Sequence, residues 1–445
     1  MAEKRPHMLR RDLGEAIIKK FGMEGIVSQI GEYGIRSPDG ILEDICCKLQ
    51  NNSAVLLIDE YDAPLTHHID KKDELNEIIS ILNDFYAAVK QNTGRFRFIF
   101  ITGVTRVSHV SIFSAFNNLK DLSLTREFNS LLGFTQNDLE RYFDDYIGNA
   151  GKVLNMKKEE IYKRIEEYYD GFQFSIHADE TLYNPWSILN FLDSPQNGFK
   201  NYWFESGGTS SLLINYLKIK DNFDFLDYDN REMIVDDFTV ESKYELSNIP
   251  YNILLYQTGY FTIRKIDDNI ARLVLANEEV EESIYRLYLL ANNLNPKDEL
   301  RKKMVQLSSA IDTKDLPTII TIFNKILNEC VSSLSKIFND ERSVRDIIYA
   351  ALTYIPSLRI IKERETSKGK SYLEIFTKKT CMIIEFKRSY TGRRSAAEAL
   401  KLAIEQIEKS RYGITFSSNY TLYRVAMVIS TEGKIILENF CKEVL

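Results

Sequence analysis

The sequence predicts an α/β protein with a parallel-sheet module near its N-terminus, a mainly helical middle region and a second α/β module at its C-terminus. Two short, almost wholly apolar runs at residues 54–58 and 96–103 flank a helical pattern. Strand and helix patterns alternate again between residues 364 and 429. Uninterrupted apolar runs of this length are typical of strands buried on both faces of a parallel sheet. We place the three predicted domains at residues 1–135, 136–300 and 301–445.

Composition and charge narrow the class of protein. A chain of 445 residues is too long for one average hydrophobic core, so two or three domains are expected. The formal net charge is −7, which gives no general argument for binding nucleic acid. The five cysteines include no C-x-x-C pair, as expected for a reducing cytoplasm. No apolar run approaches the roughly 20 residues of a membrane span, so the protein is predicted to be cytoplasmic and without a membrane partner.

The first candidate site follows the first apolar run. Asp59 and Glu60 end the strand predicted at residues 54–58, and Thr102 lies at the end of the next strand. Parallel crossovers are right-handed, so all three are expected at one sheet edge. There Asp59 could hold the Mg²⁺ of a nucleotide, Glu60 could polarise the attacking water and Thr102 could sense the γ-phosphate. The alternative is that the two acids open a turn and Thr102 merely ends its strand.

The stretch after the second strand is too polar to be core. Arg106 is a candidate for phosphate contact there, with a solvated surface arginine as the alternative. His109, Asn117 and Asn118 lie in the same stretch. The helical middle region that follows contains no arrangement of a nucleophile with a base.

The second candidate site is the triplet Glu385-Phe386-Lys387. Alternate side chains of a strand share a face, so Glu385 and Lys387 point the same way and Phe386 points to the core. Glu374 joins them if the preceding strand pairs with this one. Two carboxylates and an ammonium group at one surface suit Mg²⁺-dependent phosphodiester hydrolysis, with Glu374 and Glu385 as metal ligands. The alternative is an amphipathic strand with a salt-bridged Glu-Lys pair.

Basic residues around this triplet suggest a nucleic-acid partner in spite of the acidic total charge. They are Lys362, Arg364, Lys368, Lys370, Lys378, Lys379, Lys387, Arg388, Arg393, Arg394 and Lys401.

This C-terminal pattern resembles the PD-(D/E)XK nuclease fold, in which an acid on one strand, an E-x-K on the next and a glutamine on a later helix form the site. The resemblance implies that Gln406 is the helical glutamine and that Glu341 is an additional acid from an upstream helix. Glu374 stands where that fold normally has Asp, with a side chain one methylene longer. The resemblance therefore assigns catalytic roles to Glu374, Glu385, Lys387, Glu341 and Gln406.

Over nearly its whole length the chain resembles the bacterial family that joins an AAA-ATPase-like domain to a C-terminal PD-(D/E)XK nuclease-like domain. The motifs that carry the resemblance, in order, are LLIDEYDAPL, ITGVTRVSHVSIFSAFNNLKDLSL, YDGFQF, LYNPWSILNFL, YWFESGG, LLYQTGYFTI and IIEFKRS. The family implies a P-loop NTPase-like sheet in which Asp59 and Glu60 are the Walker B acids and Thr102 ends the sensor strand.

The chain departs from that family in its phosphate-binding loop. No G-x-x-x-x-G-K-[ST] segment occurs in the sequence, so the chain is expected to be an N-terminally shortened member with a truncated P-loop NTPase-like sheet. Without the loop, a site loses its main contacts to the β- and γ-phosphates. We therefore expect ATP to bind weakly if at all, and ATP hydrolysis to be weak or absent.

The sequence thus predicts an ATPase-like protein joined to a nuclease-like domain that uses Mg²⁺ or Mn²⁺ and acts on nucleic acid, with DNA preferred to RNA. The alternative is a non-catalytic nucleic-acid-binding or regulatory protein with two degenerate sites. A third hypothesis is an NTPase that takes its phosphate loop from a partner chain. The sequence leaves the oligomeric state open.

Overall fold

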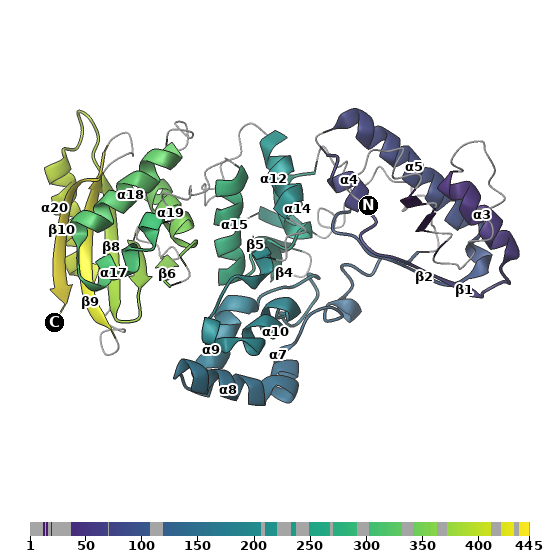
Figure 1. The fold of residues 1–445 in the computed structure, drawn as a ribbon, viewed down its shortest axis with the longest axis horizontal. Coiled ribbons are helices and arrows are strands. Elements are labelled where there is room, and N and C mark those ends of the chain that lie inside the picture. Colours follow the sequence, from purple (N-terminus) through teal and green to yellow (C-terminus); the bar gives the residue numbers. More distant parts are fainter. Residues whose placement is uncertain are drawn as a thin grey trace. The chain divides into compact units, whose positions relative to one another are not determined.

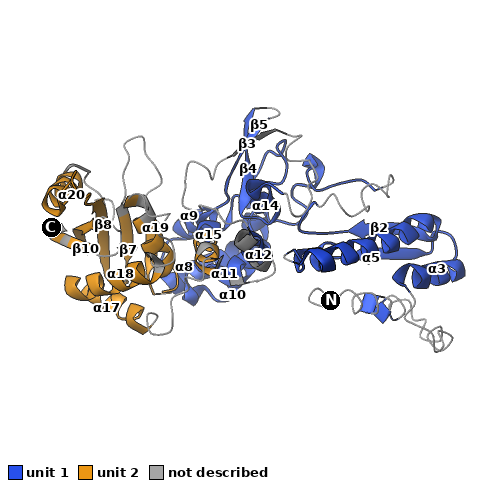
Figure 2. Cartoon of the chain, turned by 90° about the horizontal axis from the view of Figure 1, so that it is seen from above, with its two compact units in different colours: residues 1–221, 229–281 blue, residues 222–228, 282–445 orange. Residues whose placement is uncertain are grey.

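The protein divides into two compact units, residues 1–221 with 229–281 and residues 222–228 with 282–445 (Figure 2). The computed structural model describes residues 12–13, 15–16, 19, 37–69, 71–106, 119–205, 210–219, 233–236, 249–267, 270–291, 302–331, 341–355, 357–362, 372–410, 420–430 and 436–444. The boundary between the units falls inside one helix, α15. The three domains predicted from the sequence stay a prediction.

The first unit begins with a strand–helix–strand arrangement, as the sequence predicted. Strand β1 (Ala54–Ile58) pairs in parallel with β2 (Phe96–Ile101). Helices α3 (Pro38–Lys48) and α5 (Lys72–Gln91) pack against each other and run along the two strands (Figure 1). The short helices α4 (Ala63–Thr66) and η1 (Thr93–Arg95) connect these elements. The apolar stripe of α5 forms the core of this part, with Ile78, Ile81, Leu82, Phe85, Tyr86, Ala88 and Val89 buried.

One expectation for these strands is wrong. Both were predicted to be buried on both faces, but alternate residues are exposed. Val55 stands in register with Phe98, and Leu57 with Phe100, so all four share one face. Leu57 is 68% exposed, and the other three are exposed as well. The physical reason is that the helices cover only one face, and no described residue buries the other.

The rest of the first unit is mainly helical with one small sheet. Strands β3 (Met233–Asp236), β4 (Phe261–Asp267) and β5 (Ile270–Leu275) form an antiparallel sheet of order β3-β5-β4, in which β4 and β5 make a hairpin. The helices are η2 (Arg126–Phe128), α7 (Gln136–Asp138), η3 (Leu139–Phe143), α8 (Asp144–Leu154), α9 (Lys158–Tyr169), α10 (Pro185–Asp193), η4 (Pro195–Asn197), α11 (Tyr202–Glu205), α12 (Ser210–Ile219), α14 (Tyr251–Gln257) and α15 (Glu278–Ala291).

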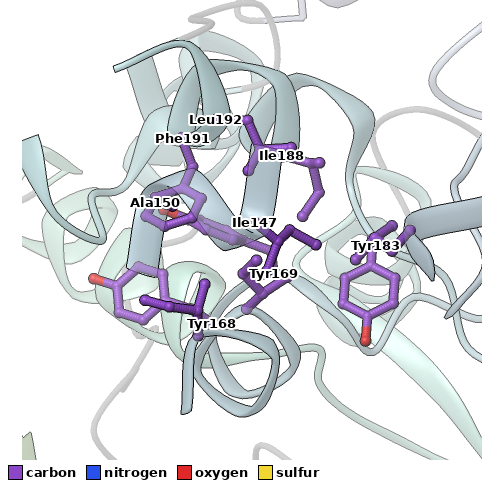
Figure 3. Close-up of a cluster of buried hydrophobic side chains, with 11 residues drawn as sticks. Ile147, Ala150, Tyr168, Tyr169, Tyr183, Ile188, Phe191 and Leu192 are labelled. Carbon is purple, nitrogen blue, oxygen red and sulfur yellow. The ribbon is translucent and has the colours of Figure 1, made fainter. Parts of the chain in front are cut away.

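An aromatic-rich core holds α8, α9 and α10 together (Figure 3). Ile147 of α8, Tyr169 of α9 and Phe191 of α10 are fully buried within it. The Tyr169 and Phe191 ring centroids are 6.0 Å apart, within the range in which aromatic pairs stabilise a core.

The second unit is an α/β module around a mixed five-stranded sheet. Its elements are α17 (Leu307–Asp312), α18 (Leu316–Val331), α19 (Glu341–Leu352), β6 (Arg359–Lys362), β7 (Tyr372–Phe376), β8 (Thr380–Arg388), α20 (Ala396–Ser410), β9 (Thr421–Ile429) and β10 (Ile436–Val444). The strand order is β10-β9-β8-β7-β6. All neighbouring strands are antiparallel except β8 and β9, which are parallel and joined by α20. The alternation of strands and helices predicted between residues 364 and 429 is therefore present in the described residues, as β7, β8, α20 and β9.

Helices cover this sheet on both faces, as Figures 1 and 2 show. Helix α20 covers the face that bears Glu385, because Ala403 and Ile407 pack on Ala426, the residue in register with Glu385. On the opposite face the Tyr423 hydroxyl donates to the carbonyl oxygen of Ile311 in α17 at 3.1 Å. Within the described ranges, no helix is both long and apolar enough to cross a membrane.

Candidate functional site

The carboxyl ends of β1 and β2 bring the first predicted group together. The Thr102 hydroxyl donates to Asp59 Oδ1 at 2.5 Å, and the Glu60 amide donates to Thr102 Oγ1 at 3.2 Å. Both acidic residues are exposed at this edge. Glu60 has a φ of +52°, a left-handed conformation that costs a non-glycine residue about 1 kcal/mol. The predicted proximity of Thr102 to the two acids is confirmed, and their roles stay a prediction.

Sequence reasoning missed the acid that orders this edge. Asp62 is 1% exposed and accepts hydrogen bonds from the Val104 amide at 3.0 Å and the Thr105 amide at 2.6 Å. The Thr105 hydroxyl also donates to Asp62 at 2.5 Å. A side chain at Gly103 would meet the Tyr61 ring at 2.3 Å, so only glycine fits there. Asp62 thus fixes the position of the chain that follows β2. The sequence signal that could have identified it is the D-E-x-D spacing, in which Asp62 is the third acid.

Arg106 belongs to a network inside the first unit. Its amide donates to Gln257 Oε1 at 3.1 Å, and its guanidinium group lies 2.6 Å from Asp121 Oδ2. Burial alone would raise the pKa of Asp121, but Arg106 and hydrogen bonds from Ser123 hold it below its ordinary value. Arg106 is therefore ion-paired rather than solvated. His109, Asn117 and Asn118 lie outside the described residues.

In the second unit, Glu385 and Lys387 point to the same face of β8, as predicted. Lys387 Nζ lies 2.9 Å from Glu385 Oε1, and Phe386 is buried on the opposite face. Glu385 is 0% exposed, whereas the Lys387 side chain is 16% exposed. A buried carboxylate requires a partner to offset its lost hydration, and Lys387 supplies one.

Glu374 lies on the same sheet face but not opposite Glu385. It stands in register with Ile383, while the residue in register with Glu385 is Tyr372. Glu374 is 5% exposed, and its charge acts on Cys381, whose pKa is raised to about 12 first by burial and then by Glu374. The strand that carries Glu374 does pair with β8, as the predicted site required. The register, however, places Glu374 two residues away from the position opposite Glu385.

The two helical site residues lie near this strand. Glu341 Oε1, at the start of α19, accepts from the Arg388 amide at 3.1 Å and lies 3.6 Å from Arg394 Nη1. Gln406 is half-buried on α20, the helix over the Glu385 face. No hydrogen bond between these described side chains links Gln406 to Glu385 or to Lys387. Glu341 therefore lies beside the end of β8 and Gln406 lies on the helix over its Glu385 face, and their catalytic roles stay a prediction.

The predicted basic cluster is divided by the fold. Lys362 is buried, with its Nζ 3.9 Å from Asp346 Oδ1. Lys378 and Lys379 are exposed in the β7–β8 turn, about 25 Å along β8 from its carboxyl end. Residues 364, 368 and 370 lie outside the described part. Lys387, Arg388, Arg393, Arg394 and Lys401 follow one another from the end of β8 into α20.

The described acids do not fit a metal centre of the expected kind. Among the residues that the structure describes, no three His, Cys, Asp or Glu side chains are grouped to hold a metal ion. Glu385 is ion-paired with Lys387, and Glu341 is paired with Arg394. Two carboxylates that share one Mg²⁺ need their oxygens about 3 Å apart, since Mg–O distances are about 2.1 Å.

Comparisons with known proteins agree with the N-terminal part of this description. Residues 31–113 match the model of the AAA-ATPase-like family, described as predicted AAA-ATPase. The chain is also similar to an uncharacterized protein encoded in the 5′ region of vnfD in Azotobacter chroococcum mcd 1, with 26% identity over 339 residues. That match covers 75% of this chain and 62% of the relative. The chain thus spans less than two thirds of the relative's length, and the AAA-ATPase-like similarity covers the β1–β2 core.

Proposed function

We propose that the protein binds nucleic acid through its C-terminal unit and that its AAA-ATPase-like core serves as a scaffold with little or no ATP hydrolysis of its own. One observation supports the proposal that the C-terminal unit binds nucleic acid. The order α19, β6, β7, β8, α20, β9, with β8 and β9 parallel, places an E-x-K pair at the end of a central strand. That order supports the resemblance to the PD-(D/E)XK nuclease fold.

The basic turn after β8 is the proposed contact surface for phosphates. Arg393 is exposed, and Arg394 is partly exposed beside it. The turn is held by hydrogen bonds between the backbone groups of Tyr390 and Arg394 at 2.9 Å, and the Arg394 guanidinium lies 5.6 Å from the centre of the Tyr390 ring. A guanidinium held in one place loses less conformational entropy when it binds a phosphate. Such contacts make affinity depend strongly on salt concentration.

The test compares two pairs of basic residues by fluorescence anisotropy with labelled single- and double-stranded DNA and RNA. We expect Arg393→Ala/Arg394→Ala to weaken binding about tenfold and to lower the salt slope by about 1 to 2. The matched control is Lys378→Ala/Lys379→Ala, which removes two exposed charges from the far end of β8. Equal effects of the two variants, or no binding by the wild type, would contradict the proposal.

A second candidate function, metal-dependent phosphodiester cleavage, is suggested by the E-x-K spacing of Glu385 and Lys387 on β8 and by the element order that resembles a nuclease fold. Incubation of the same labelled substrates with Mg²⁺ or Mn²⁺ separates the two functions. Under our proposal the wild type binds without cutting. Cutting that disappears in both Glu385→Ala and Lys387→Ala would instead establish a nuclease.

For the N-terminal core, we propose that Asp59 and Thr102 retain the edge at which an ATPase would hold Mg²⁺-nucleotide, while turnover is weak or absent. The support is their direct hydrogen bond and the similarity of residues 31–113 to predicted AAA-ATPases. Phosphate release is the measurement. Turnover above background that is abolished by Glu60→Gln would show that the core is a working ATPase.

A further inference from the structure

The register of β7 and β8 determines which position could share a ligand with Glu385. In an antiparallel pair, residues directly opposite have Cβ atoms about 4.5–5.5 Å apart, and diagonal neighbours are about 7–8 Å apart. Tyr372 is directly opposite Glu385, and Glu374 is opposite Ile383. Position 372 is therefore the nearest place on β7 for a second carboxylate.

The surroundings of Glu374 point in the same direction. Cys381 stands opposite Phe376, which places it on the side of Glu374 that is away from Glu385. Cys381 also belongs to a buried apolar cluster with Phe376 and Ile383. Glu374 is thus in register with Ile383, a member of this apolar cluster, and not with Glu385.

We infer that position 372, rather than Glu374, is where this sheet would take the second metal-binding carboxylate, and that a tyrosine stands there in place of an acid. The inference rests on the proposed function, because it explains why a module with nuclease-like strand order binds nucleic acid without cutting it. The inference also predicts that one substitution at position 372 gives the protein a metal-binding site. Tyr372→Asp restores an acid directly opposite Glu385.

The experiment measures Mn²⁺ binding by the full-length chain with electron paramagnetic resonance. All variants carry Asp59→Asn, which removes the candidate metal ligand of the N-terminal core. We expect Tyr372→Asp to bind Mn²⁺ at least about tenfold more tightly than the parent and than Tyr372→Asn, a control of matched size without the charge. The gain should disappear in Tyr372→Asp/Glu385→Gln and persist in Tyr372→Asp/Glu374→Gln. Circular dichroism checks that each variant is folded.

Three results would overturn the inference. The first is Mn²⁺ binding by the parent that is lost in Glu385→Gln. The second is a folded Tyr372→Asp variant that binds no more tightly than Tyr372→Asn. The third is a gain that requires Glu374. Nucleic-acid anisotropy measured on the same samples keeps this test separate from the proposed function, because a chain that gains Mn²⁺ binding yet binds no nucleic acid contradicts only the latter.

Discussion

The ends of β1 and β8 both carry acids at the edge of a sheet, but the two edges differ in what those acids contact. Asp59 and Glu60 are exposed, and Asp59 meets a neutral hydroxyl, that of Thr102. Glu385 is fully buried and paired with the Lys387 ammonium group. An exposed carboxylate keeps its hydration until a ligand arrives, whereas a buried one must be compensated within the fold. An acid in the sequence is therefore a candidate ligand only after its burial and partners are known.

The largest effect is expected at the acid that supports the exposed edge. Asp62→Ala removes the acceptor of the buried Thr105 amide and of the half-buried Val104 amide, and each unsatisfied amide costs about 1–3 kcal/mol. We expect a loss of about 4 kcal/mol in the free energy of unfolding of the first unit, measured by urea denaturation. Asp62→Asn keeps an acceptor oxygen and should lose less. If both variants unfold like the wild type, Asp62 does not order the chain after β2.

A somewhat smaller effect is expected at the buried pair. Lys387→Ala leaves Glu385 buried without its ammonium partner, which should destabilise the second unit by about 3 kcal/mol. In the double variant Glu385→Gln/Lys387→Met the charge is gone, so part of that stability should return. Urea denaturation of both variants tests this. A double variant less stable than Lys387→Ala would show that the ion pair itself stabilises the unit.

At the exposed edge the hydrogen bond is worth little to the fold. Thr102→Val keeps the side-chain shape but removes the donor to Asp59. It should lower the free energy of unfolding of the first unit by about 1 kcal/mol or less, measured by urea denaturation. Thr102→Ser retains the hydroxyl and serves as the control. A loss as large as that of Asp62→Ala would mean that Asp59 and Thr102 are structural rather than available to a ligand.

Asp170 differs from the acids at both strand ends, because it is partly buried and has no ion pair among its described contacts. Burial raises the pKa of Asp170, opposed by hydrogen bonds from Thr181 and Gly171 and by the charge of Arg264. A carboxyl whose folded pKa is raised contributes stability at low pH, and this stability is lost as the pH rises through the folded pKa. Asp170→Asn should therefore stabilise the first unit more at pH 7 than at pH 4. Thermal melts at the two pH values test the sign, and the reverse order would contradict it.

How far sequence reasoning succeeded can be seen from particular elements. Strands β1 and β2 and helix α20 were predictable because each follows a local pattern of apolar residues. The contact between Glu385 and Lys387 was predictable from the period of a strand. Asp62 was missed, since its partners lie more than forty residues away and only the fold brings them together.

The sequence by itself determined the strand–helix–strand core, the E-x-K pair on one strand face and the helices around it, because these depend on spacings within single elements. Only the tertiary structure decided that Val55 and Leu57 are exposed, that Lys362 is buried and that position 372 rather than Glu374 is in register with Glu385. Those outcomes depend on which face the helices cover and on strand register. Register is set by long-range pairing, and a shift of two residues leaves the local pattern unchanged.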